Sequence, residues 1–305
     1  MQRIRSFVDE FGWRAYAIPV LTIITVWILV DIITSPDASL QATPAPSSPE
    51  ASPTAMVGPD PATLSPADLS IFDLPEGGPY AESGDGTYRP IGTPGAAAGE
   101  GRENIVRYVI EVENGVDTTG QGGDDAVARM IDSTLLDPRG WTNDPQFRLE
   151  HVAPDAERTL TIRLVSSKTV ADLCGTTIKL ETSCRIEDNV YLNHSRWVRG
   201  AVPFEGNIGT YQQYLINHEV GHALGYEQHQ PCSVDGELAP IMMQQTISLS
   251  NDDLAKISPG DVYSADGKVC RYNGWPYPTA TAPAPGVPQS AAEAVSVAPV
   301  PETAE

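Results

Sequence analysis

Basic side chains are scarce in this sequence. Lys and Arg number 19 against 40 Asp and Glu, and the formal net charge is −21. A protein that binds nucleic acid concentrates positive charge to meet the phosphates, so we expect no nucleic-acid partner. The acidity indicates instead a chain that stays in solution outside the cell, and it identifies no substrate.

Aromatic residues are also few, at 7%, whereas Pro and Gly number 27 and 26. Two segments account for much of this bias, because residues 34–101 and 277–305 consist largely of Pro, Ala, Ser, Thr and Gly. Such segments hold too little apolar surface to offset the entropy lost on folding. We therefore predict a disordered acidic linker over 34–101 and a disordered tail over 277–305.

A run without any charged side chain spans residues 15–30, near the N-terminus. Arg3, Arg5 and Arg14 precede it, and Asp31 follows it. Positive charge on the N-terminal side of an apolar run keeps that side in the cytoplasm and exports the other side. The rest of the chain is therefore expected outside the membrane.

We interpret the run as an uncleaved signal-anchor, with a cytoplasmic segment at 1–14 and a transmembrane helix at 15–33. This predicts a single-pass protein of the cell membrane with an extracytoplasmic domain. A cleaved signal peptide is the alternative, and it would release the protein from the membrane. Residues 38–42 offer only a poor small-residue cleavage site, which favours the anchor.

Between linker and tail, residues 102–276 show the periodicity of folded elements and suffice for one domain with a core. We expect strands at 107–112, 147–152, 159–165 and 190–193 and helices at 124–135 and 211–224. Strands that come first, with a long helix midway, predict an α+β domain. Thr210 and Gln213 form a capping-box pattern before the long helix, and Gly225 suits the left-handed turn that ends it.

Only four cysteines are present, and all lie inside this domain. An even number in an exported chain favours two disulfides. Sequence alone permits three pairings, of which we favour the nearest neighbours, Cys174–Cys184 and Cys232–Cys270. Thiolate ligation of a metal is the alternative, and it lacks the usual C-x₂₋₄-C spacing.

The segment from Asn217 to Cys232 reads NHEVGHALGYEQHQPC and carries three of the five histidines. His218 and His222 are four residues apart, so on a helix they project from one face and can reach one Zn²⁺ ion. Glu219 lies beside the first of them, where it can take a proton from water. The H-E-x-x-H pattern therefore predicts a zinc site with two histidine ligands and Glu219 as catalytic base.

The third zinc ligand is expected at His229. In the longer metzincin signature, H-E-x-x-H-x-x-G-x-x-H, a glycine turns the chain back toward the metal, and Gly225 occupies that place. The last histidine of the signature would stand where Gln228 is found, so we infer a one-residue insertion in the turn. Glu227, or a residue further on, is the alternative third ligand.

A pair of methionines follows the histidines. Residues 239–246 read APIMMQQT, which fits the methionine turn that lies beneath the three histidines of metzincins. Such a methionine packs under the ligands and does not bind the metal. We assign this role to Met242 in preference to Met243, and ordinary core packing is the alternative.

Together these motifs resemble a family of secreted, largely actinobacterial proteins known only as a domain of unknown function, with metzincin-like zinc motifs. The resemblance covers about 102–276, and its motifs occur in the same order. They are LDPRGWT at 136–142, RW at 196–197, NHEVGH at 217–222, His229 with Cys232, MMQQT at 242–246 and NGWP at 273–276. The resemblance implies a metzincin-like fold, zinc on the three histidines, Glu219 as base and Met242 beneath. It implies nothing about the substrate.

We therefore expect a membrane-anchored, extracytoplasmic zinc endopeptidase that cuts a peptide or protein substrate. A non-catalytic cell-surface binding module that keeps zinc for structure is one alternative. The intact Glu219 argues against it, because a structural zinc site needs no base. A zinc hydrolase of a non-peptide cell-wall amide is the other alternative, and no sequence feature excludes it.

Overall fold

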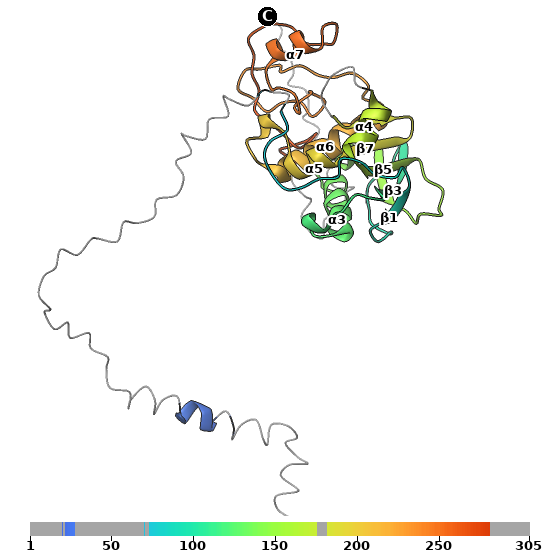
Figure 1. Cartoon of the computed structure of the whole chain (residues 1–305), viewed down its shortest axis with the longest axis vertical. Coiled ribbons are helices and arrows are strands. Elements are labelled where there is room, and N and C mark those ends of the chain that lie inside the picture. Colours follow the sequence, from blue (N-terminus) through green and yellow to red (C-terminus); the bar gives the residue numbers. More distant parts are fainter. Residues whose placement is uncertain (1–19, 21, 28–69, 71–72, 176–181, 281–305) are drawn as a thin grey trace, which may run out of the picture. The chain divides into compact units, whose positions relative to one another are not determined.

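The structure, a computed structural model, describes residues 20, 22–27, 70, 73–175 and 182–280 (Figure 1). The chain divides into two compact units, Met1–Pro59 and Asp60–Glu305, and each is described by itself. In the first unit the description is limited to residues 20 and 22–27, which are helical.

Several expectations fall on residues outside the described set. They are the cytoplasmic segment 1–14, most of the signal-anchor 15–33, the linker from 34 to 69 and the tail from 281 onward. Among the residues that the structure does describe, no helix is both long and apolar enough to cross a membrane.

A mixed sheet forms the centre of the second unit. Its middle strands run parallel in the spatial order β4 (Phe147–His151), β3 (Asn104–Glu113), β5 (Leu160–Val165) and β7 (Asn189–Asn193). Three antiparallel strands flank them: β2 (Ala97–Gly99) beside β4, β6 (Cys184–Ile186) beside β7, and β1 (Tyr88–Ile91) beside the C-terminal half of β3. The four strands predicted from the sequence are the four parallel ones.

The expected linker boundary at residue 101 is wrong, because β1 and β2 lie inside that segment. Edge strands need few apolar side chains, since backbone hydrogen bonds to one neighbour hold them. Arg89 in β1 donates to Oδ2 of Asp124 at 2.8 Å and to the carbonyl of Val116 at 2.9 Å. Ile91 is buried in the core. The folded domain thus begins well before residue 102.

Two helices pack with the sheet into one core, and the domain is α+β. They are α3 (Asp124–Leu135), which has the predicted bounds, and α6 (Ile208–Ala223), the long helix expected at 211–224. Ile131 of α3 and Ile216 of α6 share the core with Ile110 of β3. The shorter helices α4 (Ser167–Cys174), α5 (His194–Arg199) and α7 (Asn251–Ile257) were not expected from the sequence.

The long helix α6 starts earlier than the capping-box pattern indicates. Its N-cap is Asn207, whose side-chain oxygen accepts the N–H of Thr210 at 3.1 Å. Gly206, with φ 81°, turns the chain into the helix. An asparagine cap satisfies the same free N–H groups that threonine would, so Thr210 lies in the first turn instead of before it.

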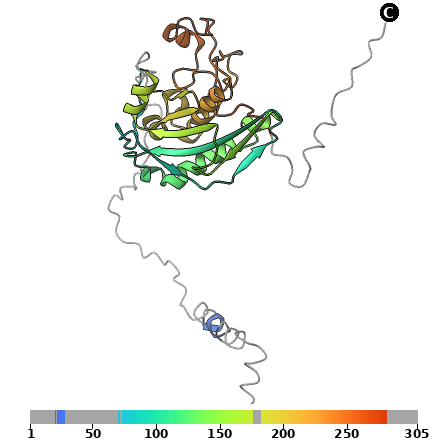
Figure 2. The same cartoon turned by 90° about the vertical axis from the view of Figure 1, so that its right-hand side faces the viewer.

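Residues 230–272, which we call the C-terminal lobe, form a second small core. In both views α7 and its loops lie at the opposite end of the domain from α3 and β1 (Figures 1 and 2). The buried residues of this core are Cys232, Ala239, Met243, Ile247, Leu254, Tyr263 and Cys270. Within this fully described stretch α7 is the one helix, so the lobe is built mostly from irregular chain.

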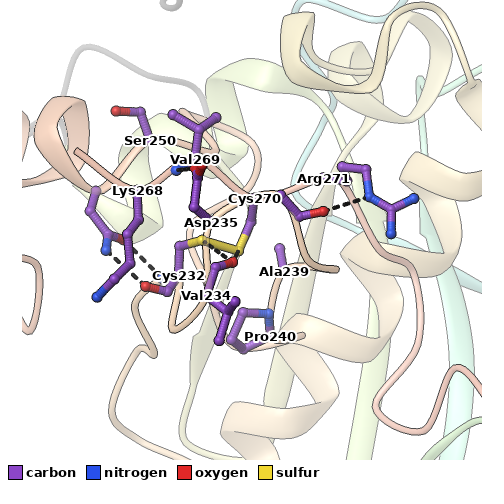
Figure 3. The surroundings of a disulfide bond; sticks show 12 residues. Cys232, Val234, Asp235, Ala239, Pro240, Ser250, Lys268, Val269, Cys270 and Arg271 are labelled. Atoms are coloured by element: carbon purple, nitrogen blue, oxygen red, sulfur yellow. Dashed lines mark hydrogen bonds between the residues drawn. A yellow bond between two sulfur atoms is a disulfide. The ribbon is translucent and has the colours of Figure 1, made fainter. Parts of the chain in front are cut away.

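Both disulfides join the cysteine pairs expected from the sequence. Cys174–Cys184 connects the end of α4 to β6, ten residues apart. Cys232–Cys270 closes the C-terminal lobe, and its two cysteines are 38 positions apart in the sequence. Figure 3 shows the second bond between the segment of Val234 and the returning segment of Val269. The lobe is therefore fastened where its chain enters and leaves.

Candidate metal centre

Three histidines come together near the C-terminal end of α6. They are His218, His222 and His229, whose ligand atoms all lie within 4.8 Å of one another. The first two project from successive turns of α6, with ring centroids 4.8 Å apart. The ring of His229 approaches from the following segment, 5.7 Å from that of His218 and 5.3 Å from that of His222. Glu227, the alternative ligand, is not in this group of described side chains.

The turn after α6 brings the ring of His229 to the other two histidines. Gly225 has φ 102°, and a Cβ there would meet none of the described atoms within 4 Å. The left-handed backbone, and not lack of space, therefore favours glycine. The N–H of Tyr226 bonds the carbonyl of Gly221 at 3.0 Å, and the tyrosine ring stacks on Trp141 at 4.6 Å. The chain leaves this anchored turn toward the other two histidines.

Backbone carbonyls orient the two histidines of the helix. Nδ1 of His218 lies 2.9 Å from the carbonyl oxygen of Ile241, and Nδ1 of His222 lies 2.9 Å from that of Tyr226. Because a carbonyl oxygen only accepts, both Nδ1 atoms carry the proton. The Nε2 lone pairs are therefore available to a shared ligand.

Side chains hold His229 on both of its nitrogens. Nδ1 lies 2.8 Å from Oδ2 of Asp261, and Nε2 lies 2.9 Å from the amide nitrogen of Gln244. The carboxylate accepts a hydrogen bond from Nδ1, and the amide donates a hydrogen bond to Nε2. Both contacts select the tautomer found in the other two histidines.

Burial keeps the helix histidines neutral. It lowers the pKa of His218 to about 3, with a further lowering by the neighbouring His222, and it lowers the pKa of His222 as well. Neutral imidazole nitrogens suit zinc, copper, iron and nickel. Three such ligands with a fourth position open is an arrangement of catalytic zinc sites. The residues present therefore fit a zinc ion.

Glu219 and the three histidines line one cavity of about 360 Å³. Glu219 is 5% exposed, and burial raises the pKa of its carboxyl to about 8. A carboxyl with a pKa near neutrality can both take and return a proton. The cavity thus combines a ligand set with a group suited to acid–base chemistry.

Met242 packs directly under the histidine-bearing turn of α6. A Cβ built on Gly221 would stand 2.6 Å from Sδ of Met242 and 2.7 Å from Cζ2 of Trp141. Met243 instead belongs to the core of the C-terminal lobe. Of the two methionines, Met242 is the one that contacts the helix between His218 and His222.

Residues 74–278 match the family described as "Protein of unknown function (DUF3152)". The chain belongs to this family. No curated protein and no solved structure matches it. The matched range includes β1 and β2, in agreement with a DUF3152 domain that begins before residue 102.

Sequence reasoning missed three side chains around the site of this DUF3152 domain. Asp261 follows His229 by 32 residues, and no motif fixes that distance. Gln244 stands two residues after Met242, so the methionine-turn pattern was the one signal for it. Arg185 of β6 lines the cavity beside Cys184, and its charge helps to lower the pKa of His222.

Proposed function

We propose that this chain is a zinc-dependent endopeptidase of the metzincin type, with its catalytic site in the DUF3152 domain. The observation that carries the proposal is the convergence of three histidines with Glu219 on one cavity. When bound, Zn²⁺ supplies a Lewis acid that polarises a scissile carbonyl and lowers the pKa of water toward ~7.

The roles of the protein's own groups follow from their positions. His218, His222 and His229 would hold the metal through Nε2, because each Nδ1 is already engaged. At His229 the metal would replace the amide of Gln244, which donates to that Nε2. Glu219 takes the proton of the attacking water and later gives it to the leaving amine. Burial raises the pKa of this carboxyl, and the charge of a bound Zn²⁺ would lower it again, so that the group can take the proton and then return it.

The strand that borders the cavity favours an extended peptide as the substrate. Among the described strands β6 is the last of the sheet, with β7 as its hydrogen-bonded neighbour, and its residues Cys184 and Arg185 line the cavity. The second edge of such a strand offers backbone N–H and C=O groups to a substrate strand. A peptide laid along β6 would pass the histidines, which favours an endopeptidase over a purely structural zinc site.

Two further features support a metzincin relationship. Gly225 turns the chain after the helix, and Met242 packs on Gly221 between two of the histidines, as expected from the metzincin signature. The two disulfides fit an oxidising compartment outside the cytoplasm. We accordingly propose an extracytoplasmic domain anchored through residues 15–33, with release after signal cleavage as the alternative.

The test measures zinc content and peptide cleavage on the full chain purified in detergent. We expect one zinc per wild-type chain, cleavage within a peptide library, and a Glu219→Gln variant that keeps zinc but loses cleavage. Zinc retained without any cleavage would favour the binding module or the non-peptide amide hydrolase. Absence of zinc binding would overturn the proposal.

A further inference from the structure

The three histidines are oriented by two different kinds of partner. For His218 and His222 the partner is a backbone carbonyl, at 2.9 Å in each case. For His229 it is the carboxylate of Asp261, at 2.8 Å. A backbone carbonyl survives any substitution at its own residue, whereas a carboxylate does not. The third histidine alone therefore depends on a side chain for the partner of its Nδ1.

Asp261 is itself held in place by its own loop. Its N–H bonds the carbonyl of Ser258 at 3.1 Å, and its Oδ1 accepts the N–H of Val262 at 2.8 Å. The other oxygen, Oδ2, is left to face His229. The side chains of Asp261 and His229 are 25% and 19% exposed, so water reaches this contact only in part. A fixed and partly buried carboxylate can set the orientation of a ring.

Tyr263 adds a second contact from the same loop. Its ring lies nearly parallel to that of His229, with centroids 6.4 Å apart and planes 22° apart. Its hydroxyl oxygen accepts the N–H of Gln244 at 3.0 Å, and the Gln244 amide reaches Nε2 of His229. The loop that carries Asp261 thus encloses the third histidine from two sides.

His229 needs such support because no helix orients it. It lies four residues beyond Gly225, on irregular chain that is one residue longer than the metzincin signature. A carboxylate bonded to the far nitrogen of a ligating histidine fixes its tautomer and ring plane and raises its basicity. Asp261 is placed to fix the orientation of a ring that no helix holds.

We infer that Asp261 is the positioning residue of the third metal ligand, which makes the C-terminal lobe part of the metal centre. The inference rests on the zinc site of the proposed function. It adds a residue to that site and assigns a role to a lobe that contributes no catalytic group.

The experiment compares zinc affinities on the full chain in detergent, by competition with a chromophoric chelator. We expect Asp261→Asn to weaken zinc binding about 10- to 100-fold, the usual effect of removing an outer partner of a metal-bound histidine. Glu237→Gln is the matched control, because it removes one exposed carboxylate from the same lobe, and its zinc affinity should equal that of the wild type.

A second readout separates positioning from folding. In excess chelator, Asp261→Asn should unfold at the same urea concentration as the control variant, and Asp261→Glu should recover part of the lost zinc affinity. If Asp261→Asn unfolds early and Asp261→Glu recovers nothing, the residue serves folding and the inference is overturned.

The remaining outcomes distinguish the inference from the function beneath it. Wild-type zinc binding with an unchanged Asp261→Asn variant would overturn the positioning role and leave the proposed peptidase intact. Wild-type chain that binds no zinc would overturn both. A His229→Ala variant that binds zinc as tightly as the wild type would show that His229 is not a ligand, and Asp261 would then have no ligand to position.

Discussion

Helix α6 places His218 and His222 on one face through regular backbone geometry, whereas the C-terminal lobe holds His229 through side chains that are distant in the sequence. In the helix, the spacing of four residues alone puts two rings on one face. In the lobe, the carboxylate that holds the third ring comes from 32 residues further along.

The lobe replaces regular structure with specific side-chain bonds. Asn251 accepts the N–H of Cys232 at 2.8 Å and donates to its carbonyl at 2.9 Å. Just past the end of the lobe, Asn273 donates to the carbonyl of Ala239 at 3.0 Å. The candidate metal centre therefore has two parts. The helical spacing of the sequence determines where the histidines of α6 lie, whereas only tertiary contacts determine where His229 and its partners lie. Four predictions test this division.

The largest effect should come from the helix, which carries the proposed catalytic base. We expect Glu219→Gln to lower peptide cleavage about 10²- to 10⁴-fold, the usual contribution of general acid–base catalysis. Zinc affinity should not change, because we propose this carboxyl as a base and not as a ligand. Steady-state cleavage assays and zinc titration measure the two quantities.

Glu227→Gln is the control for that prediction, since Glu227 lines the same cavity. It should change cleavage far less and leave zinc in place. A loss of zinc in Glu227→Gln would instead identify Glu227, and not His229, as the third ligand.

The lobe should respond most strongly to loss of its disulfide. Replacing Cys232 and Cys270 by serine should cost about 4 kcal/mol of unfolding free energy, because the bond closes a loop of 38 residues. Zinc affinity should fall as well, since the loop of Asp261 loses its attachment. Urea unfolding in chelator, followed by zinc competition, measures both effects.

Replacing Cys174 and Cys184 by serine is the matched control on the side of the sheet. Its loop of ten residues predicts a loss of about 3 kcal/mol, and the zinc ligands should keep their affinity. Equal losses of zinc affinity in the two double variants would contradict the separate role that we assign to the lobe.

The difference between local periodicity and tertiary contacts also explains how much of the fold could be predicted from the sequence. The four parallel strands and α3 were predictable because buried strands and an amphipathic helix repeat with clear periods. β1, β2 and β6 were not, because edge strands of three or four residues are held by backbone bonds that leave little trace in composition. The expected linker boundary failed for this reason.

The candidate site divides in the same way. His218, Glu219 and His222 follow from one helical motif, and His229 and Met242 from the order of the motifs behind it. Asp261 could not be predicted, since many acidic residues occur in this chain and nothing local sets one apart. Its role depends on how the lobe folds back, which is a tertiary property.

Acid should lower the free energy of unfolding through His194, which is not one of the candidate metal ligands. Nδ1 of His194 accepts the N–H of Ala81 at 3.0 Å, and burial lowers the pKa of His194 from 6.5 to about 4. The unfolded chain therefore binds more protons between those values. Stability should fall as the pH drops from 6.5 toward 4, by about 3 kcal/mol.

His194→Asn sharpens that test, because the amide oxygen can accept the same N–H without titrating. The difference in unfolding free energy between wild type and variant should shrink or reverse from pH 7 to pH 5. Measurements in chelator keep zinc out of the comparison. Parallel pH profiles for the two proteins would show that His194 does not carry this sensitivity.

The smallest effect should appear where the two regions meet, at the contact between α6 and Met242. Gly221→Ala places a Cβ 2.6 Å from Sδ of Met242 and 2.7 Å from Cζ2 of Trp141, and such overpacking costs about 1–3 kcal/mol. Gly209→Ala is the control in the same helix, because its Cβ meets no described atom within 4 Å. It should stabilise the protein by about 0.5–1 kcal/mol through helix propensity alone. Opposite signs in urea unfolding would show that Gly221 is required by the methionine beneath it, whereas equal signs would mean that helix and lobe are not tightly joined at this point.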